Sequence, residues 1–307
     1  TKSSAASDVY KRQELSFLEI QKGDIRSINL LKSALKNHGF FSITDHGLNE
    51  GLINKCYKSS KSFFDLDYKT KILYSSIGSK GARGYTPKGI ETAVGEKIPD
   101  QKEFWHHGPQ IDPSFDQRIP ANLIIKEVPD FNKNFDELYI QLHKIGSKVL
   151  SVIALSLDLD SNYFDLWIEK GNSLLRSIHY PPVNASENPH RARAHEDINL
   201  ITLLIGAEEG GLEVLNNDGS WIKVNPSSNA IVCNIGDMLQ LVTEKKLKST
   251  THRVINQDKK ISKSRYSIPF FLHPSPSVKL KSIYDDNDSG ILANDFLNKR
   301  LEEIKLY

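Results

Sequence analysis

From about Leu174 onward, the chain consists of short strand-like runs separated by turn-forming residues. The segments Asn217-Asp218-Gly219 and Gly236-Asp237 are two of these turn signals. Short strands joined by frequent tight turns are typical of an antiparallel sandwich or barrel. The sequence therefore predicts an all-β architecture for the C-terminal half.

A regular helical pattern precedes this region. Its apolar residues recur at alternating spacings of four and three, which places them on one face of a helix. They are Phe131, Phe135, Leu138, Leu142, Ile145, Val149 and Val152. We expect a long helix that packs against the β region.

The N-terminal region mixes both kinds of pattern. Residues 15–20 alternate as in an edge strand, and apolar residues at helical spacing follow up to a stop at Gly39. Residues 40–44 predict a short strand, and a second helix reaches about Phe64. Residues 78–120 are rich in glycine and proline and predict long loops, which often carry function.

We divide the chain by these changes in pattern. The units are residues 14–125, a helical connector at 126–170, the β domain at 171–280 and a polar helical tail at 281–307. The only methionine is Met238, so we expect residues 1–13 to be translated leader rather than native sequence.

Composition excludes several classes of function. The 40 Lys+Arg against 38 Asp+Glu give a formal charge of +2, without the basic field that nucleic acid or anionic lipid requires. No run reaches the roughly 18 apolar residues of a membrane helix. Cys56 and Cys233 are too far apart in sequence for a secreted disulfide framework. We expect a cytoplasmic protein with a small-molecule substrate, for which a monomer is acceptable.

Three residues have the chemistry of a metal site. His195 and Asp197 are separated by one residue, so on a strand they project to the same side. His252, at the start of another strand-like run, offers a third ligand. Two histidines and a carboxylate on one face leave three positions open and are typical of non-haem Fe(II) oxygenases. Catalytic zinc uses similar ligands, but the helical His-Glu-x-x-His signature is absent.

A second pair of residues suggests a carboxylate receptor. Arg265 and Ser267 share a strand face by the same two-residue period. A guanidinium forms bidentate pairs with carboxylates, so the two could hold the far end of 2-oxoglutarate while its keto acid end chelates iron.

In combination, these motifs resemble the isopenicillin N synthase-like branch of the Fe(II)- and 2-oxoglutarate-dependent oxygenases over nearly the whole chain. Segments 236–240 and 248–254 resemble the strand-turn-strand unit that leads to the distal histidine, and 39–47 resembles the N-terminal region. The resemblance implies an α+β fold with a double-stranded β-helix, or jelly roll, after a mixed N-terminal region. The helix over about 131–156 would buttress it.

The resemblance also implies the cofactors and the reaction. Fe(II) would be held by His195, Asp197 and His252, and 2-oxoglutarate by Arg265 and Ser267. With O2, the cosubstrate would give succinate and CO2 while a small molecule such as an amino acid is oxidised, most often to an alcohol.

Further site residues follow from strand alternation and from the family. Arg176 and Tyr180 share a face and are expected to contact cosubstrate or substrate, although Tyr180 could simply cap the core. The loop that contains Arg83, Tyr85 and Glu91 resembles a substrate-proximal segment of bacterial members, including ethylene-forming enzymes that also oxidise arginine. Glu91 matches a position that contacts a guanidinium, although a solvated carboxylate is the alternative.

Phe104 and Phe271 complete the candidate substrate contacts.

Two other functions remain open at this point. An isopenicillin N synthase-like oxidase would use Fe(II) and O2 without 2-oxoglutarate. A jelly-roll ligand sensor would not catalyse at all, but it has no need for open metal positions.

Overall fold

The computed structural model describes residues 14–75, 82–92, 99–112, 114–182, 190–205, 210–256 and 263–304. The expected leader at 1–13 lies outside them. The helices are α2 (Phe17–Gln21), α3 (Ile25–His38), α4 (Glu50–Phe64), α5 (Tyr68–Ile72), α6 (Phe131–Ser156), α7 (Asp165–Ile168), α8 (Asp237–Val242) and α9 (Ala293–Glu303).

The strands form two main sheets. The large sheet has the order β1-β2-β10-β7-β12-β5-β4-β3, and the small sheet has the order β6-β11-β8-β9. Neighbouring strands pair antiparallel, except that β1 and β2 are parallel. The bounds are β1 (Glu14–Ser16), β2 (Phe40–Thr44), β3 (Gly84–Thr86), β4 (Glu103–His107), β5 (Leu174–Tyr180), β6 (His190–His195), β7 (Ile201–Ile205), β8 (Leu212–Leu215), β9 (Trp221–Lys223), β10 (Ile231–Ile235), β11 (His252–Ile255), β12 (Arg265–Leu272), β13 (Lys279–Leu280) and β14 (Ile291–Leu292).

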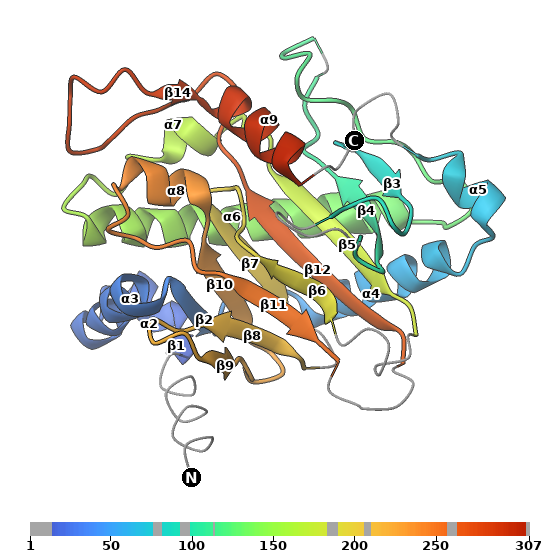
Figure 1. Ribbon diagram of the computed structural model, residues 1–307, viewed down its shortest axis with the longest axis horizontal. Helices are drawn as coiled ribbons and strands as arrows, with labels where there is room; N and C mark the ends of the chain where they lie inside the picture. The colour runs from blue at the N-terminus through green and yellow to red at the C-terminus, as the bar shows by residue number, and fades with distance from the viewer. Residues whose placement is uncertain are drawn as a thin grey trace.

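The two sheets pack together as a jelly roll, which confirms the predicted fold. One cluster of buried apolar side chains, including Ile178, Leu212 and Val254, fills the space between the sheets. On the other face of the large sheet lies α6, which Figure 1 shows running across the strands. Gly146 of α6 allows close packing there, because a Cβ would lie 3.0 Å from a methyl of Leu272. The expected buttressing helix is therefore confirmed.

Local sequence signals explain the N-terminal elements. Asp24 caps α3 by accepting a hydrogen bond from the backbone N–H of Ser27. Gly39 ends the helix with φ of 63°, and a Cβ at this position would lie 2.1 Å from the backbone oxygen of Lys248. Glycine is thus required by both backbone conformation and space. The predicted strand at 40–44 and the helix that reaches Phe64 are also present.

Two predictions of secondary structure were wrong. Residues 15–20 form only a short strand before the chain turns into α2, because Ser16 accepts a hydrogen bond from Glu19 N and starts a helix. Residues 78–120 contain two strands of the large sheet, β3 and β4, where only long loops were expected. The expected turn signal Gly236-Asp237 lies between β10 and α8, where a Cβ on Gly236 would lie only 2.1 Å from the Asn199 oxygen.

Cys56 and Cys233 are both buried, and burial raises the pKa of each thiol. They serve as small apolar side chains in the core. Among the residues described, no helix combines the length and apolar character needed to cross a bilayer.

Candidate active site

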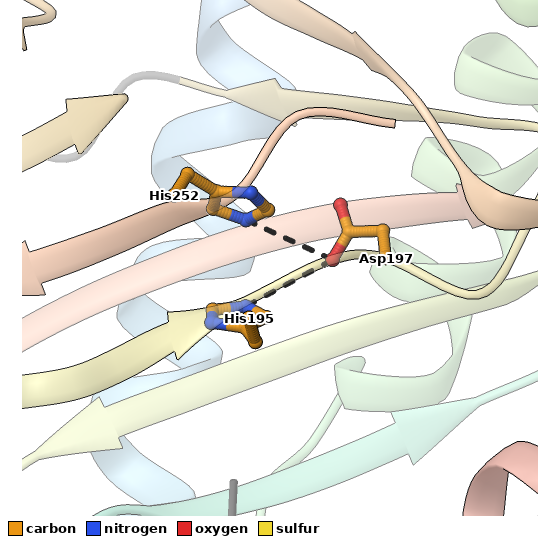
Figure 2. Close-up of side chains that lie close together, drawn as sticks. All are labelled: His195, Asp197 and His252. Carbon is orange, nitrogen blue, oxygen red and sulfur yellow. Dashed lines mark ion pairs between the residues drawn. The ribbon is translucent and has the colours of Figure 1, made fainter. Parts of the chain in front are cut away.

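The three predicted metal-binding side chains meet in space. His195 ends β6, Asp197 follows it by two residues and His252 begins β11, which pairs with β6 at His195. Asp197 Oδ1 lies 3.9 Å from His195 Nε2 and 3.8 Å from His252 Nε2. Figure 2 shows both imidazoles directed at this carboxylate. All three ligand atoms lie within 4.8 Å of one another, the spacing of a shared metal ion.

Neighbouring groups hold the imidazoles in the orientation that a metal requires. Nδ1 of His195 lies 2.7 Å from the backbone oxygen of Arg193, and Nδ1 of His252 lies 3.2 Å from that of Thr250. A backbone carbonyl accepts only from a protonated nitrogen, so in the neutral form of each ring Nε2 carries the lone pair, and it faces the site. Burial is the main cause that lowers the pKa of His195 to about 4. Its neutral form therefore predominates at neutral pH.

Asp197 is oriented through its other oxygen. Oδ2 accepts hydrogen bonds from Thr202 Oγ1 at 2.6 Å and Asn234 Nδ2 at 2.7 Å. Burial alone would raise the pKa of Asp197, but the two histidines and these hydrogen bonds outweigh it and lower the pKa. The site thus offers two imidazoles and one carboxylate, a donor set that suits Fe(II) and leaves coordination positions open.

A cavity of about 390 Å³ lies beside the triad, between the sheets and α9. Strands β5 and β12 run antiparallel along it, and alternate residues of each face it, as the two-residue period requires. From one end to the other, the β5 side presents Tyr180, Ile178, Arg176, Leu174 and Asn172. The β12 side presents Arg265, Ser267, Pro269, Phe271 and His273.

One end of the cavity, called here the Arg265 end, has the features of a carboxylate receptor. Arg265 is paired in register with Tyr180, and Ser267 with Ile178. The guanidinium of Arg265 lies 5.2 Å from the ring centre of Tyr180. Arg265 and Ser267 are both buried and both line the cavity. The residues present therefore fit a keto acid whose far carboxylate lies at this end.

The opposite end, called here the Arg83 end, is formed by Arg83, Asn172 and His273. Arg83 Nη2 donates to Asn172 Oδ1 at 2.8 Å. Burial lowers the pKa of Arg83 to about 10, so the guanidinium remains charged at neutral pH. Burial also lowers the pKa of His273 to about 4, so its imidazole is neutral there. Phe271 is paired in strand register with Thr202, whose hydroxyl donates to Asp197. The triad therefore lies between the two ends of the cavity.

A buried ionic network lines the cavity around Arg176. Glu91 forms ion pairs with Lys102 Nζ at 2.5 Å and Arg176 Nη1 at 3.1 Å. Lys102 also pairs with Asp100, which pairs with Arg193. Burial alone would raise the pKa of Glu91, but Arg176 and Lys102 lower it well below its usual range. Glu91 does meet a guanidinium, but it is that of Arg176 within the same chain.

The structure corrects two of the candidate substrate residues. Tyr85 lies on the far side of the sheet, where its hydroxyl donates to Glu103 Oε2 at 2.5 Å, and it does not line the cavity. Phe104 also does not line the cavity, because the guanidinium of Arg176 covers its ring at 4.3 Å. Arg83, Glu91 and Phe271 do line it.

Several residues at the site were not singled out by sequence. They are Asp100, Lys102, Asn172, His273 and Asn234. The sequence does contain a signal for His273, because it continues the two-residue strand period that places Arg265, Ser267 and Phe271 on one face. No such signal exists for Asp100 and Lys102, since they lie in a segment without clear periodicity.

Comparisons with known proteins agree with this geometry. The profile of the 2OG-Fe(II) oxygenase superfamily matches residues 171–274. The profile described as the N-terminal region of a non-haem dioxygenase in morphine synthesis matches residues 15–127. The fold and the site thus define a non-haem Fe(II) dioxygenase that uses 2-oxoglutarate and O2.

Individual proteins extend the similarity to almost the full chain. A 2-oxoglutarate-dependent dioxygenase of Didymella fabae is 30% identical, with 89% of each chain covered. The crystal structure of a 2OG-Fe(II) oxygenase family protein from Caulobacter crescentus is 40% identical, covers 95% of this chain and 98% of its own, and has a TM-score of 0.86. A Neurospora crassa protein in complex with alpha-KG and thymine is 26% identical, with a TM-score of 0.81 and coverage of 94% and 96%. The chain belongs to the 2OG-Fe(II) oxygenase superfamily.

Proposed function

We propose that this enzyme hydroxylates a small molecule and couples that oxidation to the conversion of 2-oxoglutarate to succinate and CO2. In this proposal His195, Asp197 and His252 bind Fe(II), and Arg265 with Ser267 binds the distal carboxylate of 2-oxoglutarate. One observation carries the proposal: the triad and the Arg265 end open into the same cavity.

The bound iron and keto acid supply the oxidising power from O2, and the chain supplies position and charge. Thr202 and Asn234 fix the Asp197 carboxylate, and backbone carbonyls fix the two imidazoles. Arg265 and Ser267 set the direction of the keto acid along β12.

Helix α9 contributes to the exclusion of water. Leu297, Leu301 and Ile304 line the cavity, and the N–H of Thr92 donates to the backbone oxygen of Ile304 at 3.2 Å. Arg300 connects the helix to Asp237 of α8 at 2.9 Å. This cover keeps the reacting groups out of bulk water.

An amino acid is our first candidate for the substrate. The substrates named for related proteins differ, so this choice rests on the cavity: it is small, and it combines charged side chains with Phe271 and Leu174. A compact substrate that has both a charged group and an apolar part fits such a lining.

The test is an anaerobic titration of the Fe(II)-loaded protein with 2-oxoglutarate, followed by addition of O2 and quantification of succinate. We expect the weak visible band of an iron-chelated keto acid, then succinate. Arg265→Met should weaken 2-oxoglutarate binding about 10- to 100-fold, because a charged hydrogen-bonded pair is lost. Arg26→Met, at an exposed position on α3, is the matched control.

Iron binding without the band or succinate would contradict the proposal. It would favour instead an oxidase that uses Fe(II) and O2 alone. Ligand binding without any turnover would favour a sensor.

A further inference from the structure

The guanidinium of Arg83 is a buried charge whose hydrogen bonds are only partly satisfied. Its side chain is 2% exposed, Nη1 donates to the backbone oxygen of Ala82 and Nη2 to Asn172. Nε is buried without a partner. No ion pair joins Arg83 to a carboxylate in the described parts of the chain. A buried charge without a counter-ion is costly, and a ligand anion would remove that cost.

The groups around Arg83 also offer donors. Asn172 directs Oδ1 at Arg83, so its Nδ2 is left to donate elsewhere, and no described residue accepts from it. Arg176 uses Nε for His106 and Nη1 for Glu91, and Nη2 has no acceptor among the residues that the structure describes. His273 Nδ1 is buried without a partner. The unused N–H groups of Arg83, Asn172 and Arg176 match an oxyanion.

The nearby carboxylates do not compete for this role. Both oxygens of Glu91 are paired, one with Lys102 and one with Arg176. Both oxygens of Asp100 are also paired, one with Lys102 and one with Arg193. A cationic substrate would have to break an ion pair that is already buried, whereas an anionic substrate would meet unused donors.

We propose that the substrate carries a carboxylate and that this group binds at the Arg83 end, to Arg83, Asn172 and Arg176. The inference rests on the proposed function, since it places 2-oxoglutarate at the Arg265 end. An amino acid would then be recognised by its carboxylate, and Glu91 would position Arg176 without contacting a substrate cation.

The order of residues along the cavity supports this arrangement. From Asn172, β5 leads to Arg176 and then to Tyr180 at the Arg265 end. Phe271 lies next to Thr202, close to the triad. A carboxylate at Arg83 would therefore place the carbon chain against Phe271 and direct its other part toward the metal site. The rings of Phe104 and Phe271 lie 4.3 and 5.3 Å from the Arg176 guanidinium and hold it in place.

The test uses pairs of probes that differ in charge but hardly in shape: benzoate with benzamide, and hexanoate with hexanamide. Binding is measured by calorimetry on the anaerobic Fe(II) enzyme with saturating 2-oxoglutarate, so that Arg265 is occupied. In the wild type we expect at least one carboxylate to bind about 10- to 100-fold more tightly than its amide, as a charge-assisted contact predicts. Agmatine, a guanidinium without a carboxylate, should not bind.

Two variants assign the preference to this end of the cavity. Arg83→Met should remove it. Asn172→Asp should also remove it, because the new carboxylate would neutralise Arg83 without emptying the site. The affinity for 2-oxoglutarate should stay unchanged in both, and Arg26→Met should behave as the wild type.

Equal binding of acid and amide, no binding by either carboxylate, or binding of agmatine would overturn the inference. The inference would also be overturned if both variants still bound a carboxylate more tightly than its amide. The proposed function fails by a different result, the absence of the keto acid band and of succinate. The two failures are therefore distinguishable.

Discussion

The two faces of strands β4 and β5 carry similar residues but have opposite roles. The face toward the cavity holds Arg176 and His106, whose guanidinium and imidazole are 2.6 Å apart. The face toward α4 holds Glu103 and His179, 2.8 Å apart, with Lys71 2.8 Å from the same carboxylate. On the first face donors remain available to a ligand. On the second face both oxygens of Glu103 are occupied.

This difference shows that residue type alone does not identify a site. Glu103, His179, Lys71 and Tyr85 have the chemistry of an acid-base centre, yet they are buried and do not line the cavity beside the triad. A side chain can bind a ligand when it lies on the strand face that lines the cavity and still has a donor or acceptor without a partner in the protein.

The largest effect is expected on the cavity face. Asp197→Ala removes the only anionic ligand of the triad, so Fe(II) binding and succinate formation should fall below detection. The measurements are iron content after reconstitution and succinate per enzyme. Asp160→Ala, at an exposed position, is the control. Turnover that persists in Asp197→Ala would exclude the assigned triad.

On the opposite face, the main effect should be on stability. Lys71→Met leaves Glu103 buried with its ion pair broken, which should lower the free energy of unfolding by about 3–5 kcal/mol. Lys61→Met breaks an exposed ion pair with Asp65 and should cost less than about 1 kcal/mol. Denaturant unfolding measures both. If Lys71→Met instead changed 2-oxoglutarate affinity in the folded protein, the two faces would not be independent.

Low pH should reduce the contribution of the Glu103 cluster to the free energy of unfolding. Burial alone would raise the pKa of Glu103, but hydrogen bonds from His179, Lys71 and Tyr85 lower it from 4.5 to about 2. A carboxyl whose pKa is lowered by folding stabilises the native state above its unfolded pKa and loses that contribution as the pH falls through the folded value.

The loss should therefore occur between about pH 4.5 and pH 2 and amount to about 3 kcal/mol. Urea unfolding at a series of pH values measures it. Glu103→Gln should show a flatter profile in this window, although it is less stable at neutral pH. An equally steep profile in the variant would assign the acid sensitivity to other groups.

Much of the fold and the triad could be predicted from sequence because their signals are local and periodic. His195 and Asp197 are two residues apart on a strand, and the α6 stripe repeats over many turns. The ionic network could not be predicted, since Glu91, Lys102 and Arg193 come from separate segments. Tyr85 was expected to contact the substrate because its loop resembles a substrate-proximal segment, and its strand, Gly84–Thr86, is too short for the sequence to show which face the side chain takes.

Two serines offer the finest comparison of the faces. Ser267 lies on the cavity face of β12, and Ser177 lies on the opposite face of β5, where it donates to Ser60 Oγ at 2.7 Å. Ser267→Ala should raise the dissociation constant of 2-oxoglutarate about tenfold, equivalent to ~1.4 kcal/mol, through loss of one hydroxyl donor. Ser177→Ala should leave that constant unchanged and lower stability by about 1 kcal/mol. Anaerobic titration and denaturant unfolding separate the two effects. If both variants changed 2-oxoglutarate binding equally, the effect could not be assigned to a direct contact with Ser267. The distal carboxylate of 2-oxoglutarate would then be bound by Arg265 alone.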